Sequence, residues 1–580
     1  MKLSDYITEC LAKEVKHVFV GNGGCVVHLL DSIDKNRNLK GVPCENEQGA
    51  AIAAEAYARV TAKMGVSIAT SGPGMVNLIQ GIACAYFDSI PCLFISGESP
   101  TAQLRGERRV RQMGFQEMDV IGIVRPLTKY AVLVTDPRKI RYEMEKLFFM
   151  ARDGRPGPVL LDLPDDIQRQ EINPAELEPY IPQEQARVLP ASAIGQAIAL
   201  IEQAHRPVVV VGGGVKLGNA KKLLEEFLRK AVIPFATTWA TIDMFLDNTA
   251  GLIGNFGISA NRAGNFAVQN ADLIINLGSR LDTHQTGSKP QAFAPQAKKI
   301  SVDIDETELN KNNGMQIDLK FNCDIKTFLS ALNARTVRPR DLSGWKEKIR
   351  QWRIKYPICP REYYSQKEKV NPYVFMDELS RQTKDSDIII TDAGATLTWT
   401  MQGYKMRHRQ MLFSAFNHSP MGYALPASIG AQFAAPKRQV ICLIGDGGLQ
   451  MNIQELETVV YNKLPIKIFV MNNSGYGIIK QTQDTWLNSR YVAADPGSGL
   501  GFPDFGKIAA AYGIKTEEIK NHKELKTKLK KALQLKGPVV YDIKVKSGEK
   551  IIPKLEFGRP IEDSSPLLPR EEFIKNMLNE

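Results

Sequence analysis

The residues with the clearest chemical potential are an aspartate and two asparagines that follow two predicted strands. Residues 440–444 are rich in Val and Ile and run into Gly445-Asp446-Gly447-Gly448, which indicates a buried strand ending in a tight turn. Apolar residues at helical spacing come next, and a second apolar run, residues 466–471, ends at Asn472 and Asn473. The pattern predicts a right-handed β-α-β unit, so Asp446 and Asn473 should meet at one edge of a parallel sheet.

These residue types suit a magnesium ion. A carboxylate, an amide oxygen and a nearby backbone carbonyl are hard donors, and Mg²⁺ usually completes its octahedron with water and phosphate oxygens. The glycines around Asp446 would let a diphosphate approach the backbone and the N-terminus of the following helix. A plain turn beside an Asn-rich loop explains the same residues without a ligand, and for the GDG triplet alone it is the favoured interpretation.

The first 170 residues supply a second group of interest, Glu47. Short apolar runs at 17–20, 65–70, 91–96 and 158–163 alternate with helical patterns, which predicts a parallel, doubly wound sheet. Glu47 lies where one strand ends and an Ala-rich helix begins. By itself it is interpreted as a carboxylate favoured by a helix N-terminus.

The whole chain is expected to be an α/β protein built from three doubly wound parallel-sheet domains. Stretches that are rich in Pro and Glu, or charged and broken by Pro, separate them. The expected divisions are domains at 1–170, 191–335 and 371–548, linkers at 171–190 and 336–370, and a C-terminal tail at 549–580.

Composition argues against several classes of protein. The apolar runs are far shorter than the ~20 residues of a membrane helix, and the N-terminus lacks the apolar core of a signal peptide, so a cytoplasmic protein is expected. The eight cysteines form no CxxC pair and the seven histidines no ligand cluster, so the cysteines are interpreted as reduced core residues. Much of the net charge of +11 falls on a lysine-rich helix face within 515–554, without a nucleic-acid motif, and the positive balance favours small anionic ligands.

Several motifs together resemble the thiamine diphosphate (ThDP) enzymes. GDG followed by NN at the next strand end is similar to their cofactor-binding motif, and the match around it resembles the acetohydroxyacid synthase (acetolactate synthase) large-subunit branch. Four further segments agree in order: ENEQGA around Glu47, SGPG at 71–74, GFQE at 114–117 and MGYALPASIGA at 421–431. The resemblance covers nearly all of the chain to about residue 545. It implies a pyrimidine-binding, a central Rossmann-like and a diphosphate-binding domain.

The resemblance also implies the roles of individual residues. Glu47 would hydrogen-bond the aminopyrimidine of ThDP and promote loss of the C2 proton, and Met421 would hold the cofactor in its bent shape. Phe115 and Gln116 would join them at the catalytic centre. The implied metal ligands are Asp446, Asn473 and the Gly475 carbonyl. The implied cofactor-binding residues are Gly23, Gly24, Gly72, Pro73, Asn77, Gly394, Ala395, Met421, Gly445, Asp446, Gly447, Gly448, Asn473, Gly475, Tyr476 and Gly477.

A glycine turn in the central domain, at 212–214, has the form of a Rossmann turn. It suits either a dinucleotide phosphate or a purely structural role. The resemblance implies a structural FAD here, although the RFDDR segment of the family becomes RLDTH at 280–284. The implied FAD residues are Gly212, Gly213, Gly214, Gly278, Arg280 and Asp303.

The substrate pocket is where the sequence departs from the family. The implied pocket residues are Lys129, Ile478, Ile479 and Thr482, and Thr482 stands where the family has a tryptophan. The expected reaction decarboxylates a 2-keto acid, pyruvate before others, and transfers the two-carbon acyl-anion unit to an acceptor carbonyl. The alternatives are a keto-sugar acceptor, hydrolysis of a cyclic diketone, and a ThDP-binding protein without catalysis. The resemblance implies a homodimer or homotetramer with sites at subunit interfaces, and the composition leads us to expect no nucleic-acid or membrane partner.

Overall fold

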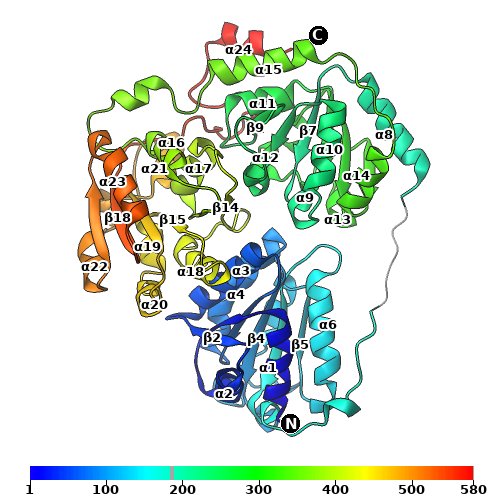
Figure 1. The fold of residues 1–580 in the computed structure, drawn as a ribbon, viewed down its shortest axis with the longest axis vertical. Helices are drawn as coiled ribbons and strands as arrows, with labels where there is room; N and C mark the ends of the chain where they lie inside the picture. The colour runs from blue at the N-terminus through cyan, green and yellow to red at the C-terminus, as the bar shows by residue number, and fades with distance from the viewer. Residues whose placement is uncertain (183–188, 579–580) are drawn as a thin grey trace.

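The chain folds around three parallel sheets. The computed structural model describes residues 1–182 and 189–578, which contain three six-stranded sheets with helices around each of them (Figure 1). Every pair of neighbouring strands within these sheets is parallel. The predicted α/β class with three parallel sheets is therefore confirmed.

The N-terminal sheet has the strand order β2-β1-β3-β4-β6-β5. It is buried on both faces: in β4, Leu93 and Ile95 belong to one core and Cys92 and Phe94 to another, which is why the strand is a continuous apolar run. The four predicted strands are found within two residues of their expected ends. The strands are β1 His17–Val20, β2 Lys40–Pro43, β3 Gly65–Ala69, β4 Cys92–Glu98, β5 Tyr130–Leu133 and β6 Val159–Pro164; the helices are α1 Leu3–Glu14, α2 Val27–Lys35, α3 Glu47–Thr61, α4 Pro73–Asp88, α5 Val120–Val124, α6 Ile140–Arg152 and α7 Asp165–Gln168.

The central sheet has the order β12-β11-β10-β7-β8-β9. It too separates two cores, since Val209 and Val211 of β7 face one cluster and Val208 and Val210 the other. The strands are β7 Pro207–Val211, β8 Phe235–Thr237, β9 Leu252–Asn255, β10 Leu273–Leu277, β11 Lys298–Asp303 and β12 Leu319–Asn322; the helices are α8 Ala191–Gln203, α9 Gly213–Leu217, α10 Lys221–Ala231, α11 Arg262–Gln269, α12 Thr283–Thr286, α13 Glu306–Leu309 and α14 Ile325–Asn333.

The C-terminal sheet has the order β14-β13-β15-β16-β18-β17 and contains the predicted β-α-β unit. Its two strands, β15 and β16, pair in parallel, but two short helices join them instead of one. The break falls at Asn452, whose side chain donates to the Gly422 carbonyl at 2.9 Å. The strands are β13 Ile388–Thr391, β14 Met411–Phe413, β15 Val440–Gly445, β16 Lys467–Asn472, β17 Lys515–Ile519 and β18 Val539–Lys544; the helices are α16 Pro372–Gln382, α17 Gly394–Gly403, α18 Ala424–Ala434, α19 Asp446–Met451, α20 Glu455–Tyr461, α21 Gly477–Trp486, α22 Phe505–Ala511 and α23 His522–Gln534.

Helices α3 and α18 join the N-terminal unit to the C-terminal unit. A Cβ atom on Gly430 would lie 1.9 Å from the Ala53 carbonyl oxygen, so the helices approach more closely than any side chain there would allow. The Tyr423 hydroxyl donates to Glu55 Oε2 at 2.7 Å across the same contact. Glu47 stands at the start of one of these two helices, so its position depends on this packing.

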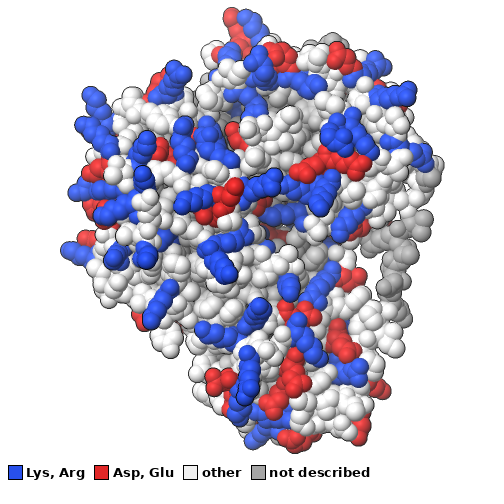
Figure 2. Space-filling model, viewed as in Figure 1, with Lys and Arg blue, Asp and Glu red and all other residues white. Residues whose placement is uncertain are grey.

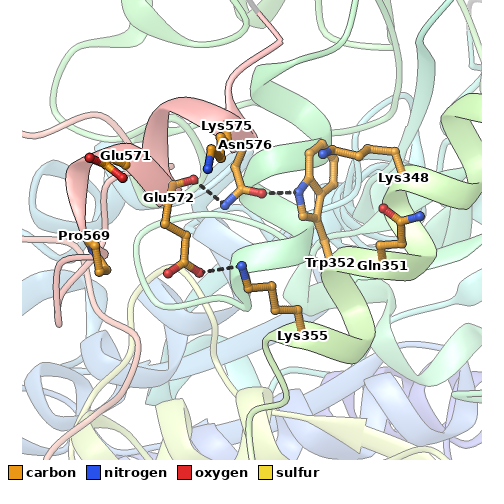
Figure 3. Close-up of a pocket in the computed structure, with 9 residues that line it drawn as sticks. All are labelled: Lys348, Gln351, Trp352, Lys355, Pro569, Glu571, Glu572, Lys575 and Asn576. Carbon is orange, nitrogen blue, oxygen red and sulfur yellow. Dashed lines mark hydrogen bonds and ion pairs between the residues drawn. The ribbon is translucent and has the colours of Figure 1, made fainter.

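The segment expected as the second linker contains a helix, and the tail docks onto it. Helix α15, Ser343–Lys355, buries Trp345, Ile349 and Trp352 on the central unit. The tail returns as α24, Arg570–Asn576, beside α15 (Figure 1). A groove of about 400 Å³ lies between them, where Trp352 Nε1 donates to Asn576 Oδ1 at 2.8 Å and Lys355 pairs with Glu572 at 2.9 Å (Figure 3). These polar groups are paired with one another, so the groove is part of the docking contact.

Basic side chains are spread over the surface of the protein. Figure 2 shows Lys and Arg spread over the visible face, with several at the left, where Figure 1 places α23. That helix buries Leu525, Leu529 and Ala532 and turns its lysines outward, as predicted for a solvated face. Within the described residues, no helix combines the length and the apolar character needed to cross a bilayer. None of the eight cysteines, which all lie within the described residues, forms a disulfide, and four of them are buried.

Candidate active site

Asp446 and the loop after β16 come together as the β-α-β pattern predicts. Asp446 begins α19 directly after β15, and its side chain is buried. Its Oδ1 accepts from the Gly447 amide at 2.7 Å, and its Oδ2 accepts from the Asn473 and Gly475 amides at 3.1 and 3.2 Å. Burial raises the pKa of Asp446 to about 6, and the backbone donors act in the opposite direction. The carboxylate is thus fixed in place by the loop that it faces.

The Asn473 side chain completes an arrangement that fits a cation. Its amide end lies 2.7 Å from the Gly475 carbonyl oxygen and 3.2 Å from Asp446 Oδ2. With its nitrogen turned inward, the amide donates to both atoms; with its oxygen turned inward, three oxygens converge on one point, as a hard cation requires. The described residues contain no cluster of three or more His, Cys, Asp or Glu side chains that could hold a metal.

Met421 and Tyr476 pack on the glycine turn around Asp446. A Cβ atom on Gly447 would lie 2.2 Å from the Tyr476 ring and 3.1 Å from the Met421 methyl group. Gly448 presses in the same way on the Asp392 carboxylate, 2.0 Å from the position of a Cβ atom. Glycine is therefore required at both positions by close contacts.

Asp392 is a residue of this site that sequence reasoning missed. It follows β13 at the same sheet edge, is buried, and accepts from the Gly422 and Ala424 amides at 3.2 and 3.0 Å. Those bonds fix the backbone next to Met421. Burial raises the pKa of Asp392 to about 6. The signal was available, because an aspartate at the end of a buried strand is the feature that singled out Asp446.

The other predicted residues of the diphosphate side gather at this edge. Gly394 has a φ of +67° and its Cβ position lies 3.6 Å from Ile478 Cγ2, while the Cβ position of Gly477 lies 3.6 Å from that of Ala395. Gly445 faces the Thr396 hydroxyl. The next segment is tied down as well, since the Tyr476 amide donates to the Ala494 carbonyl at 2.8 Å. One edge of the sheet thus presents the glycines, the carboxylate and the amide side chain together.

The side chain of Glu47 contacts residues of the N-terminal unit. It is the first residue of α3, after the N-cap Asn46, and its Oε2 accepts from Asn77 Nδ2 at 2.9 Å. Its side chain lies over two glycines, with Cγ 2.2 Å from the Cβ position of Gly21 and Oε1 3.3 Å from that of Gly74. Gly21 was not among the predicted residues. The contacts of Glu47 all come from loops at the carboxyl ends of parallel strands or from the helices that follow them.

The SGPG and GFQE segments lie against each other beside this carboxylate. Gly72 has a φ of +61°, and its Cβ position lies 2.8 Å from the Gln116 carbonyl oxygen. Gln116 itself has a φ of +63°, a conformation uncommon for residues other than glycine. Phe115 is 82% exposed, so this chain alone does not enclose it. Pro73 starts α4, and Gly23 packs on Thr70, whereas Gly24 borders open space.

Lys129 is set apart from these loops within the chain. It precedes β5, at the edge of the sheet opposite to the strand ends that carry Glu47 and Gly72, and its amino group donates to the Asp153 carbonyl. Burial lowers the pKa of Lys129 to about 8. The assignment of Lys129 to the substrate pocket stays a prediction, since within this chain it lies away from the other predicted residues.

The predicted pocket residues of α21 lie on two faces of the helix. Ile478 points to Gly394, and Thr482, one turn later, donates to the Ile478 carbonyl at 2.9 Å. Ile479 is 43% exposed. The Thr482 hydroxyl also lies 3.5 Å from the amino group of Lys554, which comes from the C-terminal tail.

The residues predicted for FAD lie together in the central unit, but their polar groups are bonded to other groups of the protein. The Gly212 amide donates to the Leu277 carbonyl and the Gly214 amide to the Gly278 carbonyl, both at 2.9 Å. A Cβ atom on Gly212 would meet Gly278 and Ser279 at 2.3 Å, so protein backbone fills that space. These amides are not free to cradle a phosphate, and the turn does not fit a dinucleotide through them. Arg280 pairs with Asp282 and Glu308, Gly213 starts α9, and Asp303 accepts from the Asp305 amide.

Comparison with known proteins identifies the class. Three profiles of the thiamine pyrophosphate enzymes match in order: the N-terminal TPP binding domain over residues 1–123, the central domain over 194–332 and the C-terminal TPP binding domain over 392–543. Fold and matches together define a thiamine pyrophosphate enzyme of three domains.

Full-length relatives narrow this class. The acetolactate synthase large subunit of Porphyra purpurea is 34% identical over 560 residues, which are 94% of this chain and 92% of that protein. That of Cyanidium caldarium is 33% identical over 98% of this chain and 96% of its own length. Acetolactate synthase 2, chloroplastic, from Nicotiana tabacum is 32% identical over 97% and 85%. The chain belongs to the acetolactate synthase large-subunit family of thiamine pyrophosphate enzymes.

Proposed function

We propose that this protein is a ThDP- and Mg²⁺-dependent carboligase that decarboxylates pyruvate and joins the two-carbon unit to an acceptor carbonyl. The observation that carries the proposal is the convergence of Asp446, the Asn473 amide and the Gly475 carbonyl beside a glycine turn at a helix N-terminus. Family membership supplies the reaction class. Bound ThDP would supply the carbon nucleophile and accept the electrons that decarboxylation releases.

The residues of the diphosphate side would bind Mg²⁺ and orient the cofactor. Asp446, Asn473 and Gly475 would hold Mg²⁺, and the Gly448 amide lies in the first turn of α19, where phosphate oxygens are favoured. Met421, packed on Gly447 and held by the bonds of Asp392, would support the bent cofactor. Glycine at 394 and 477, at the starts of α17 and α21, would let the cofactor approach the backbone of both helices.

Glu47 would hold the proton at the other end of the cofactor. Its carboxyl is fixed by Asn77 and lies over glycines, so a flat aminopyrimidine could approach it closely. As a hydrogen-bond donor to the ring nitrogen, the protonated acid would promote loss of the C2 proton. A site that only binds ThDP has no need of this acid.

Each half of the proposed site is built by one unit of the chain. The contacts of Glu47 lie within the N-terminal unit and those of Asp446 within the C-terminal unit. Phe115 is exposed beside the first half. We propose a homodimer or homotetramer in which one subunit completes the site of another. FAD is not part of the proposal, and flavin absorbance of the purified protein would check this.

Calorimetric titration tests the site. ThDP should bind only with Mg²⁺ present, and Asp446→Ala should abolish the Mg²⁺ dependence together with tight binding. Glu47→Gln should still bind ThDP, because it removes no metal ligand. Equal binding by wild type and Asp446→Ala would refute this assignment of the diphosphate side.

A further inference from the structure

Lys554 carries a partly buried ammonium group that lacks an acidic partner. Its Nζ has one polar neighbour among the described residues, the Thr482 hydroxyl at 3.5 Å, and it forms no ion pair there. The nearby acids have other partners: Asp484 pairs with Lys550 at 3.2 Å and Glu556 with Arg559 at 3.3 Å. Burial lowers the pKa of Lys554, with no carboxylate acting against it. A partly buried ammonium group has three hydrogen-bond donors and a charge to neutralise, so a bound anion would stabilise the ammonium group of Lys554.

The backbone around Lys554 is fixed on both sides. Its amide donates to the Ser565 carbonyl at 3.1 Å and its carbonyl accepts from the Ser565 amide at 2.8 Å. The Pro553 carbonyl accepts from Gln402 at 2.7 Å, and the Leu555 amide donates to the Ile258 carbonyl at 2.7 Å. The backbone that carries Lys554 is therefore held in place, with the Nζ atom 3.5 Å from the Thr482 hydroxyl of α21.

Lys554 stands on the side of α21 that leads to the proposed site. Thr482 follows Ile478 by one helical turn, and Ile478 contacts Gly394 at the cofactor edge. An acceptor whose keto carbon lies near that edge would place a neighbouring anionic group toward Thr482. The threonine leaves the path open, whereas a large aromatic side chain there would cover the ammonium group.

We propose that Lys554 is a specificity-determining residue that receives the carboxylate of the acceptor 2-keto acid beside Thr482. The inference rests on the proposed function and adds the group that recognises the acceptor. The carbon–carbon bond forms at the keto carbon of the acceptor, and the keto oxygen takes up a proton. The carboxylate held by Lys554 stays unchanged throughout.

A competition between two acceptors of similar size tests the role. Wild type and Lys554→Met are given pyruvate and 2,3-butanedione together, with pyruvate also as the donor, and the acidic and neutral adducts are quantified by mass spectrometry. Both acceptors carry a ketone next to a second carbonyl, and only pyruvate has a carboxylate. The ratio of acidic to neutral adduct should fall at least about tenfold in Lys554→Met, as expected from loss of a charged hydrogen bond.

Controls separate this role from a structural one. Lys554→Arg should recover most of the ratio, and Lys575→Met, which removes an exposed lysine of the same tail, should leave it at the wild-type value. Lys554→Gln serves if the methionine variant does not fold. An unchanged ratio in Lys554→Met or Lys554→Gln overturns the inference. Wild-type protein that releases no CO₂ from pyruvate refutes the proposed function instead, which is a different and earlier failure.

Discussion

Glu455 should make the contact between the N- and C-terminal units sensitive to pH. It is fully buried on α20, where its Oε1 accepts from the Asn46 amide at 3.1 Å and its Oε2 from the Thr458 hydroxyl at 2.8 Å. No cation pairs with it among the described residues. Burial raises its pKa from 4.5 to about 7. Asn46 caps the helix that begins with Glu47, so this carboxyl supports the proposed catalytic acid.

The sign and size follow from the two pKa values. Below pH 4.5, the pKa of Glu455 in the unfolded state, the carboxyl is protonated in both states and does not change the free energy of unfolding. Between pH 4.5 and about 7 the folded state binds the proton more tightly than the unfolded state, so stability falls as pH rises. Above that range the buried charge costs about 3 kcal/mol. Glu455→Gln keeps both contacts, because its amide can accept from Asn46 and donate to Thr458, and it removes the titration.

Thermal unfolding at several pH values measures this difference. Glu455→Gln should unfold about 6–12 °C above wild type at pH 8 and at nearly the same temperature at pH 4.5, since about 3 kcal/mol is involved and about 1 kcal/mol corresponds to about 2–4 °C for a unit of 150–250 residues. Glu457→Gln, at an exposed position of the same helix, is the control and should show no such trend. A variant that is less stable than wild type at pH 8, or equally shifted at every pH, would refute the reasoning.

Three further outcomes are expected. Glu47→Gln should bind ThDP, but the C2 proton of the bound ThDP should exchange at least about 100-fold more slowly than in wild type, as proton-exchange NMR would measure. Exchange at the wild-type rate would show that Glu47 does not have this role. Mixing inactive Glu47→Gln with inactive Asp446→Ala, under conditions that exchange subunits, should restore part of the activity, and heterodimers that stay inactive would favour a site within one chain. Gly430→Ala should lower the free energy of unfolding by about 1–3 kcal/mol, because its Cβ would lie 1.9 Å from the Ala53 carbonyl oxygen. Gly195→Ala, in open space on α8, is the control and should not destabilise the protein. Equal effects of the two substitutions on the free energy of unfolding would contradict the close packing of α3 and α18.

Local patterns carried the fold and one half of the site. The apolar runs of β15 and β16 and the residues that follow them are close in sequence, so handedness and parallel pairing were enough to bring Asp446 to Asn473. Helix α15 could have been found in the expected linker, because Trp345, Ile349 and Trp352 recur at helical spacing. The high charge of its other face concealed that pattern.

Contacts between segments far apart in the chain could not be predicted from the sequence. Nothing near Asn46 indicates that its amide would meet Glu455, 409 residues later. The same holds for Lys554, whose tail has no periodic pattern and reaches Thr482 only because its backbone is anchored to Ile258 and Ser565. Such contacts depend on how whole units pack, which a local pattern does not encode.

The stoichiometry of pyruvate turnover tests the central claim most directly. Purified protein with ThDP and Mg²⁺ is given pyruvate alone, and the pyruvate consumed, the CO₂ released and the product formed are measured in one reaction. Carboligation predicts two pyruvate molecules consumed for each CO₂, with the second recovered in acetolactate. One CO₂ for each pyruvate, with acetaldehyde as the product, or no turnover by protein that binds ThDP, would contradict a carboligase.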